Sequence, residues 1–266
     1  MKRAFLIYRA HCFSPNSVDV DRLILEEVGR CLSNIVDDVM FMSEDCLCET
    51  TIEISTNDFI FSMARSEQAL CRLREFENKG IIIINSPKSV VNCCRPKLFE
   101  MLRLRGINVP LSTGERGFWL KRGDQSAQSV DDIVYCKTQN DLSKAIKNFE
   151  SRAITDYVVQ SHIEGDLLKF YGVYGTDFFR YYYPTDDGIS KFNHEYVNGA
   201  ASHYHFNKSR FYNECCLISE ITGVKIYGGD AIVTSEGQCF FIDFNDWPSF
   251  RRCRNEAATA IVQLCK

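Results

Sequence analysis

The chain has 266 residues, of which 45% are hydrophobic and 25% are charged, as in an ordinary soluble globular protein. Its 31 basic and 35 acidic side chains give a formal net charge of −4. This balance argues against a nucleic-acid partner, because general nucleic-acid binders usually carry a basic excess. The length is sufficient to bury a full core in one or two domains.

The N-terminus and the cysteines bear on the cellular compartment. The apolar run that reaches Tyr8 ends at Arg9, so it is too short for a signal core or a membrane span, and no later stretch approaches a span. Thirteen cysteines occur without any C-x-x-C pair. We therefore expect reduced, mostly buried thiols in a cytoplasmic protein with no membrane partner.

The first 85 residues alternate apolar strands with amphipathic helices, which predicts a small open α/β domain. Leu23, Ile24, Val28 and Leu32 recur at helical spacing. The continuous β-branched run Ile81–Ile84 is typical of a strand buried on both faces of a parallel sheet. We expect strands at 5–8, 39–42, 59–63 and 81–84, and helices at 19–32 and 67–78.

The second part of the chain turns from helices to a mostly β pattern. A helix at 96–105 precedes the turn Gly106–Pro110, and a hairpin at 118–121 and 133–136 encloses a polar segment. We expect further strands at 157–160, 167–174 and 178–183, helices at 140–151, 208–222 and 255–265, and a hairpin from 227 to 244.

The hairpin at 227–244 carries the strongest chemical pattern. A turn at Ser235–Gln238 would place Asp230 directly opposite Asp243, with Cβ atoms roughly 4.5–5.5 Å apart. Strand alternation would place Asn245 on the same face as Asp243. The expected opposite pairs are Thr234 with Cys239, Ile232 with Phe241, and Asp230 with Asp243.

Two facing carboxylates repel each other unless a cation or a proton lies between them. With the amide oxygen of Asn245, they would form the all-oxygen ligand set that Mg²⁺ prefers, with Mn²⁺ as an alternative ion. Zinc would favour histidine or cysteine, and the hairpin offers only Cys239. The alternative interpretation is an exposed hairpin that carries a few acids, because the register depends on the turn.

The residues from Ile242 to Phe250 resemble the metal-binding end of the ATP-grasp superfamily, in which an acid and an asparagine two positions later precede a turn with proline. Asp230 is similar to the family's first metal-binding acid. The resemblance covers about residues 88–250 and implies an α/β (α+β) ATP-grasp fold. The implied organisation is an N-terminal α/β domain at 1–87 and an ATP-grasp domain at 88–266, with a lid subdomain at about 112–156 and a mainly antiparallel C-terminal subdomain at about 157–266.

The resemblance also implies ligands for the phosphates of ATP. Lys97 resembles the first nucleotide lysine, on the helix before the Gly106–Pro110 turn. Lys121 resembles the second lysine, on a strand of the lid. Both would neutralise phosphate charge. The loop at 122–130 departs from the family pattern, because it holds one glycine where the family often has several.

The adenine site is implied by the segment Val158–Gly165, which resembles the hinge of the family. Gln160, together with the backbone of Ser161, His162 and Ile163, would bind the edge of the base. Magnesium ions held by the hairpin would bridge the β- and γ-phosphates of ATP.

Two further basic residues bear on the reaction. Lys169 resembles a strand lysine of the inositol polyphosphate kinases, although it could instead be a rim cation that covers the sheet. Arg180 is similar to a basic residue that the superfamily places near the transferred phosphoryl group. The segment at 194–210 is expected to shape the acceptor pocket. In it His203 and His205 favour acceptor contacts or packing over a metal site, since no third ligand is evident.

Three functions remain open from the sequence. The first is an ATP-dependent ligase that forms an amide or similar bond through an acylphosphate, on a small-molecule or peptide acceptor. The alternative, supported by Lys169, is a small-molecule kinase of the inositol polyphosphate kinase type. The third is a non-catalytic nucleotide-binding interaction protein, against which the intact metal acids and both lysines argue. The sequence indicates neither the acceptor nor the oligomeric state.

Overall fold

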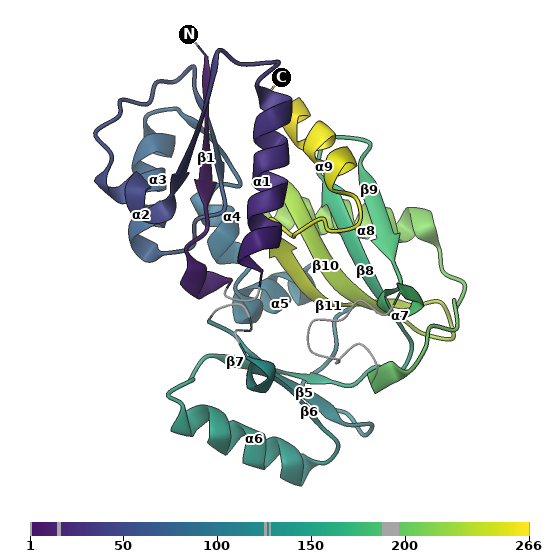
Figure 1. Cartoon of the computed structure of the whole chain (residues 1–266). Coiled ribbons are helices and arrows are strands. Elements are labelled where there is room, and N and C mark those ends of the chain that lie inside the picture. Colours follow the sequence, from purple (N-terminus) through teal and green to yellow (C-terminus); the bar gives the residue numbers. More distant parts are fainter. Residues whose placement is uncertain (1, 15–16, 125–126, 128, 188–196, 266) are drawn as a thin grey trace.

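The computed structural model describes residues 2–14, 17–124, 127, 129–187 and 197–265, and the described chain contains three β-sheets (Figure 1). A parallel sheet lies at the N-terminus, a small antiparallel sheet follows it, and a larger antiparallel sheet is built from the last hundred or so residues. The mixed α/β class expected from the sequence is confirmed. Within the described residues, none of the helices combines the length and apolarity that a membrane span requires.

The N-terminal sheet has the strand order β2-β1-β3-β4, and its neighbours are all parallel. The expected strand at Ile81–Ile84 forms, but it lies at the edge of the sheet, so Ile82 is 46% exposed and burial on both faces is wrong. The elements are β1 (Arg3–Tyr8), α1 (Val18–Leu32), β2 (Asp38–Ser43), α2 (Glu44–Glu49), β3 (Phe59–Ser62), α3 (Glu67–Asn78), β4 (Ile82–Ile84) and α4 (Pro87–Asn92), with a 3-10 turn at His11–Phe13.

The small sheet has the order β6-β5-β7 and carries helix α6 on one face. A capping box between Thr138 and Asp141 begins α6, and Leu142 and Phe149 bury its apolar side. Because β7 pairs with β5, the small sheet extends beyond residue 156, where we expected the lid to end. The elements are α5 (Arg95–Leu104), β5 (Phe118–Arg122), a 3-10 turn (Val130–Asp132), β6 (Ile133–Cys136), α6 (Gln139–Ser151) and β7 (Tyr157–Ser161).

The C-terminal sheet has the order β11-β10-β8-β9 and is antiparallel throughout. Phe170, Phe211, Phe241 and Phe244 form a fully buried aromatic core between this sheet and α8. Helix α9 packs against α1, which joins this sheet to the N-terminal one (Figure 1). The elements are β8 (Asp166–Val173), β9 (Phe179–Tyr182), α7 (Pro184–Asp187), α8 (Lys208–Thr222), β10 (Ile226–Val233), β11 (Cys239–Asp246), α9 (Arg254–Ile261) and a 3-10 turn (Val262–Cys265).

The β10–β11 hairpin contains a bulge that the sequence pattern did not predict. Asp230 pairs with Asp243 as expected, but Ala231 pairs with Phe241, so Ile242 is an extra residue in β11. The expected pairs Thr234 with Cys239 and Ile232 with Phe241 are wrong, because the turn begins one residue earlier, with the Gly237 N–H donating to the Thr234 carbonyl. The bulge compensates for the shifted turn, which restores the pairing of the two acids.

All thirteen cysteines are free thiols, in line with the expected absence of a disulfide scaffold. Six of them are buried and three are exposed, so the thiols are less uniformly buried than we expected.

Candidate active site

A cavity of about 680 Å³ opens between the three sheets, a size typical of small-molecule sites. Each sheet contributes polar side chains to its lining. These include Arg9 and Arg65 from the N-terminal part, Lys121 and Gln160 from the small sheet, and Lys169, Asp230, Asp243 and Asn245 from the C-terminal sheet.

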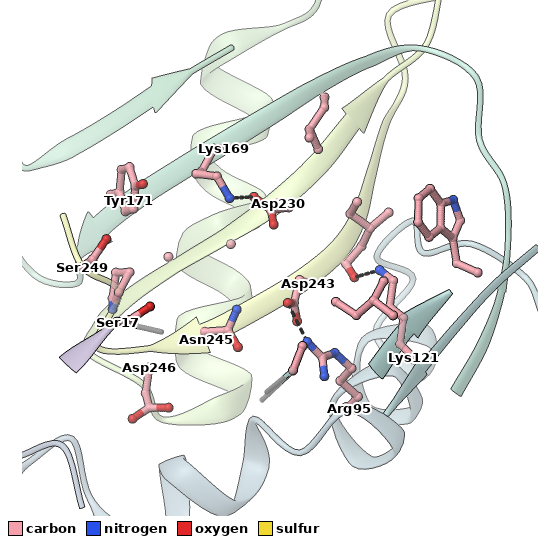
Figure 2. A pocket seen from close by; sticks show the side chains of 18 of the residues that line it. Ser17, Arg95, Lys121, Lys169, Tyr171, Asp230, Asp243, Asn245, Asp246 and Ser249 are labelled. Carbon is pink, nitrogen blue, oxygen red and sulfur yellow. Dashed lines mark hydrogen bonds and ion pairs between the residues drawn. The ribbon is translucent and has the colours of Figure 1, made fainter. Parts of the chain in front are cut away.

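Asp230 and Asp243 lie at the centre of this lining (Figure 2). The Lys169 Nζ donates to Asp230 Oδ1 at 2.7 Å, from the neighbouring position on β8. The Arg95 guanidinium binds Asp243 Oδ2 at 3.0 Å. From the sequence we expected a cation between the two acids to relieve their repulsion. In this structure two basic side chains, Lys169 and Arg95, relieve it.

The electrostatics favour an ionised Asp243. Burial alone would raise the pKa of this carboxyl, but the charges of Arg95 and Lys121 and a hydrogen bond from Asn245 outweigh burial and hold the pKa below its usual value. Asp243 is therefore a carboxylate at neutral pH. Asn245 also lines the cavity, as expected for the third oxygen ligand.

The donor set fits a hard divalent cation. Among the described residues, no three His, Cys, Asp or Glu side chains gather into a metal-binding group, so any site here consists of two carboxylates and the Asn245 amide. Gly228 and Gly229 of β10 lie beside these ligands, where close neighbours leave no room for a side chain: a Cβ on Gly228 would approach the Pro248 ring to 2.8 Å. A Cβ on Gly229 would approach the Asp243 carbonyl oxygen to 2.3 Å.

Lys121 is almost fully buried, with 6% of its surface exposed, and its Nζ donates to the carbonyl oxygen of the bulge residue Ile242 at 2.9 Å. Desolvation lowers the pKa of Lys121 to about 8, although the charge of Asp243 opposes this shift. Lys121 lines the cavity beside Asp243, where the sequence placed a phosphate ligand.

Lys97 is not brought into the cavity. It is exposed on α5, whereas Arg95, two residues earlier, is buried and lines the cavity. Two residues on a helix point about 200° apart, so only one of them faces the site. Arg95 also donates to the carbonyl oxygen of Arg122 at 2.7 Å, which ties α5 to the small sheet. Its helical spacing from the buried Leu98, Phe99 and Leu102 is the signal that could have identified it.

The hinge residues lie together at one end of the cavity. Gln160 is 1% exposed, and both polar atoms of its amide are buried without a hydrogen-bond partner among the described residues. The N–H groups of Ser161 and His162 donate to the carbonyl oxygens of Leu111 and Gly117. In the described part of the chain the Ile163 N–H has no such partner.

His162 is a neutral part of this wall. The Trp119 Nε1 donates to His162 Nδ1 at 3.1 Å, and burial lowers the pKa of the imidazole. Trp119, His162 and Ile163 give this end of the cavity an aromatic and apolar surface. A flat aromatic base suits such a surface when its polar edge can form hydrogen bonds with the amide of Gln160.

Arg180 and the two histidines lie away from the cavity lining. Arg180 pairs with Glu256 of α9. His203 contacts the Tyr183 ring at 4.4 Å, which supports packing over metal binding, and neither His203 nor His205 lines the cavity. The residues from His194 to Tyr196 lie outside the described part of the chain.

The sequence pattern missed the basic residues at the other end of the cavity. Arg65 forms an ion pair with the buried Asp246, and Arg9 pairs with Asp21 at 3.1 Å. These pairs join residues that no local pattern connects. Arg251 and Arg252 also line the cavity, and their place directly after the proline-containing turn is a signal that the sequence does offer.

No protein-family profile and no curated protein matches the sequence. Solved structures match it along its whole length. The D-alanine–D-alanine ligase of Bacillus anthracis in complex with ATP has 12% identity and a TM-score of 0.68, over 99% of this chain and 97% of the ligase. The ATP-grasp ligase PsnB, in complex with a phosphomimetic precursor variant, Mg and ADP, has 13% identity and a TM-score of 0.62, over 99% and 98%.

A third match is D-alanyl-alanine synthetase A of Vibrio cholerae, with 11% identity and a TM-score of 0.68 over 99% of this chain and 97% of the synthetase. At these identities the similarity concerns the fold, and it extends over all three sheets. The chain has the ATP-grasp fold.

Proposed function

We propose that the protein is a Mg-ATP-dependent ligase that activates a carboxylate as an acylphosphate and transfers the acyl group to an amine. The observation that carries this proposal is the pair of opposed carboxylates, Asp230 and Asp243, beside the buried Lys121 in one cavity. A buried ammonium next to two acids is costly to maintain, and the phosphates of Mg-ATP complement all three groups.

The adenine of ATP would bind at the hinge. The unpartnered amide of Gln160 can accept a hydrogen bond from the exocyclic amine of the base and donate one to a ring nitrogen. The Ile163 N–H supplies a second donor. An unsatisfied buried amide costs on the order of 1–3 kcal/mol, so a ligand that satisfies it recovers that free energy.

The phosphates would extend from the hinge toward the hairpin. Lys121 and Arg95 would neutralise their charge, and Arg95 takes the role that the sequence gave to Lys97. Asp230, Asp243 and Asn245 would hold magnesium, which when bound draws off the charge that develops during phosphoryl transfer. Lys169 would be displaced from Asp230 in that state and could then contact the acceptor.

The chemical step transfers the terminal phosphoryl group. A carboxylate oxygen of the acceptor forms a bond to the γ-phosphorus, and the bond from that phosphorus to the bridging oxygen of ADP breaks. The amine nitrogen then attacks the acyl carbon, inorganic phosphate leaves, and the amine loses a proton. Here the residues of the chain orient the acceptor and exclude water from the acylphosphate.

The similarity to ligases over nearly the full length of both chains supports a ligase above a kinase. Both a small molecule and a peptide are plausible acceptors on this fold, because the D-alanine ligases join free amino acids, as their names state, and PsnB was solved with a precursor peptide.

The decisive experiment uses carboxylic acids labelled with heavy oxygen. The purified chain is incubated with Mg-ATP, a pool of labelled acids and a pool of amines, and the released phosphate is analysed by mass spectrometry. An acylphosphate route moves one labelled oxygen from the acid into the phosphate. The Asp243→Asn variant serves as the control and should give no labelled phosphate.

The other outcomes separate the alternatives. In a parallel incubation with a pool of polyols in place of the acids, a phosphate ester formed without free phosphate would identify a hydroxyl kinase. Binding of Mg-ATP without turnover of any acceptor would favour the nucleotide-binding interaction protein, and failure to bind Mg-ATP at millimolar concentration would contradict all three functions. Unlabelled phosphate released in an amine-dependent reaction would contradict the acylphosphate route.

A further inference from the structure

The cavity carries more positive charge than its magnesium and nucleotide ligands require. The charged side chains among its described lining residues are seven lysines and arginines but only four aspartates, a formal excess of three positive charges in a protein of net charge −4. Each aspartate already has a basic partner. Lys121 lies at the end of the cavity where the nucleotide would bind, so the surplus of positive charge remains at the opposite end.

That surplus lies beyond the end of β11. Lys121 contacts β11 at Ile242, and the following turn begins at Trp247, five residues further along the strand. At about 3.3 Å per residue, the turn is roughly 16 Å from the lysine contact. In Figure 2, Ser17 and Ser249 lie on the side of the two acids away from Lys121. The acceptor, not the nucleotide, must therefore occupy this end.

The turn that leads to Arg251 is packed into the core. Trp247 and Phe250 adopt left-handed backbone conformations, with φ of 44° and 46°. Both side chains are buried, and the Phe250 ring lies 5.5 Å from that of Tyr171. These buried rings anchor the backbone from which the exposed Arg251 side chain extends. Within the described residues, Arg251 forms no ion pair, and it lines the cavity.

The N-terminal part completes the same end. Arg9 lines the cavity with its side chain 8% exposed, and its Nη2 is buried without a hydrogen-bond partner in the described chain. Ser17, the N-cap of α1, also lines the cavity, and its side chain makes no capping hydrogen bond. The α1 N-terminus adds the partial positive charge of a helix of fifteen residues.

We propose that the acceptor carries a second anionic group, in addition to the carboxylate that is activated, and that Arg251, Arg9 and the N-terminus of α1 bind this group. The proposal rests on the proposed function, since it names the class of molecule that the ligase uses. Carboxylates and phosphates share the required chemistry, and the experiment distinguishes them.

The test is calorimetric titration of the full chain, in the presence of Mg²⁺ and a non-hydrolysable ATP analogue, with three probes: glutarate, butyrate and 4-phosphonobutyrate. Glutarate should bind more tightly than butyrate, which has the same reactive group but no second charge. 4-Phosphonobutyrate shares the reactive carboxylate of glutarate and differs only in the second group, so tighter binding of glutarate would identify that group as a carboxylate and the reverse would identify it as a phosphate.

The variants locate the binding. Arg251→Gln should weaken the affinity for the better probe by about tenfold or more, since a charge-assisted hydrogen bond is lost. Arg251→Lys should retain most of the affinity. Arg30→Gln, an exposed residue on α1 outside the cavity lining, is the matched control for the loss of one charge and should bind like the wild type.

Equal binding of glutarate and butyrate, equal affinity in Arg251→Gln, or no binding of any probe to a chain that binds the ATP analogue would each overturn the proposal. A chain that does not bind the analogue, measured in a separate titration, would instead contradict the proposed function.

Discussion

The charge of Lys121 should lower the stability of the protein in the absence of nucleotide. The lysine is buried and its pKa falls from 10.5 to about 8. Each pH unit between these values corresponds to about 1.4 kcal/mol, so the charged form costs roughly 3 kcal/mol. Replacement of the lysine by an uncharged residue would recover this cost, but loss of the hydrogen bond to Ile242 would subtract about 1 kcal/mol from the stability that is gained. Lys121→Met should therefore stabilise the protein by about 2 kcal/mol at pH 7.

The sign of the pH dependence follows from the same pKa values. Between about pH 8 and 10.5 the unfolded chain retains the proton on Lys121 while the folded chain releases it, so the stability contribution of this lysine rises with pH. The advantage of the methionine variant should shrink across this window and reverse near its upper end, where the neutral lysine keeps its hydrogen bond.

Urea unfolding of both proteins at about pH 7 and about pH 9.5, followed by circular dichroism, measures this difference. Comparison of the two proteins at one pH cancels the titration of the cysteines and tyrosines. The variant should also lose affinity for Mg-ATP, measured by calorimetry. A variant that is less stable than the wild type at pH 7, or a stability difference that does not change with pH, would refute the reasoning.

Three further predictions concern the cavity. Asp243→Asn should bind Mg-ATP at least tenfold more weakly by calorimetry, because a proposed magnesium ligand is lost; circular dichroism checks that the variant is folded, and unchanged affinity would reject the metal assignment. Arg95→Met should weaken nucleotide binding at least tenfold, whereas Lys97→Met, on the exposed side of α5, should change the affinity less than twofold. A larger loss of affinity in Lys97→Met than in Arg95→Met would show that Lys97, and not Arg95, binds the nucleotide. Arg65→Met leaves the buried Asp246 without its partner and should cost about 3–5 kcal/mol in urea unfolding, so a loss below 1 kcal/mol would show that water replaces the arginine.

Local patterns predicted most of the elements. Helix α3 has the expected bounds, because Ser66 caps its first turn and its apolar residues follow the helical period. Helix α8 likewise runs from Asn207, which caps it, to Gly223, whose φ of 76° ends it. Such signals lie within a few residues of the element that they define, so one sequence suffices to find them.

The candidate site was predictable only in part. The pairing of Asp230 with Asp243 was found, although the turn was misplaced and an unexpected bulge compensated. The choice between Arg95 and Lys97 could have been made from α5 itself, because Arg95 lies at helical spacing from the buried Leu98, Phe99 and Leu102 and Lys97 does not. The pairing of Arg65 with Asp246 joins residues 181 positions apart, and only the packed chain reveals such a contact.

The bulge in β11 makes two parts of the hairpin separable. On one side of Ile242, Ala231 pairs with Phe241, and on the other, Asp230 pairs with Asp243. Deletion of Ile242 would leave both pairs in place, because it would convert the bulge into a regular ladder. Only the carbonyl oxygen that accepts the hydrogen bond from Lys121 Nζ would be lost. The two opposed acids and the contact that anchors the small sheet thus depend on different residues of the hairpin, and a one-residue change in chain length should remove the contact while preserving the pairing of the acids.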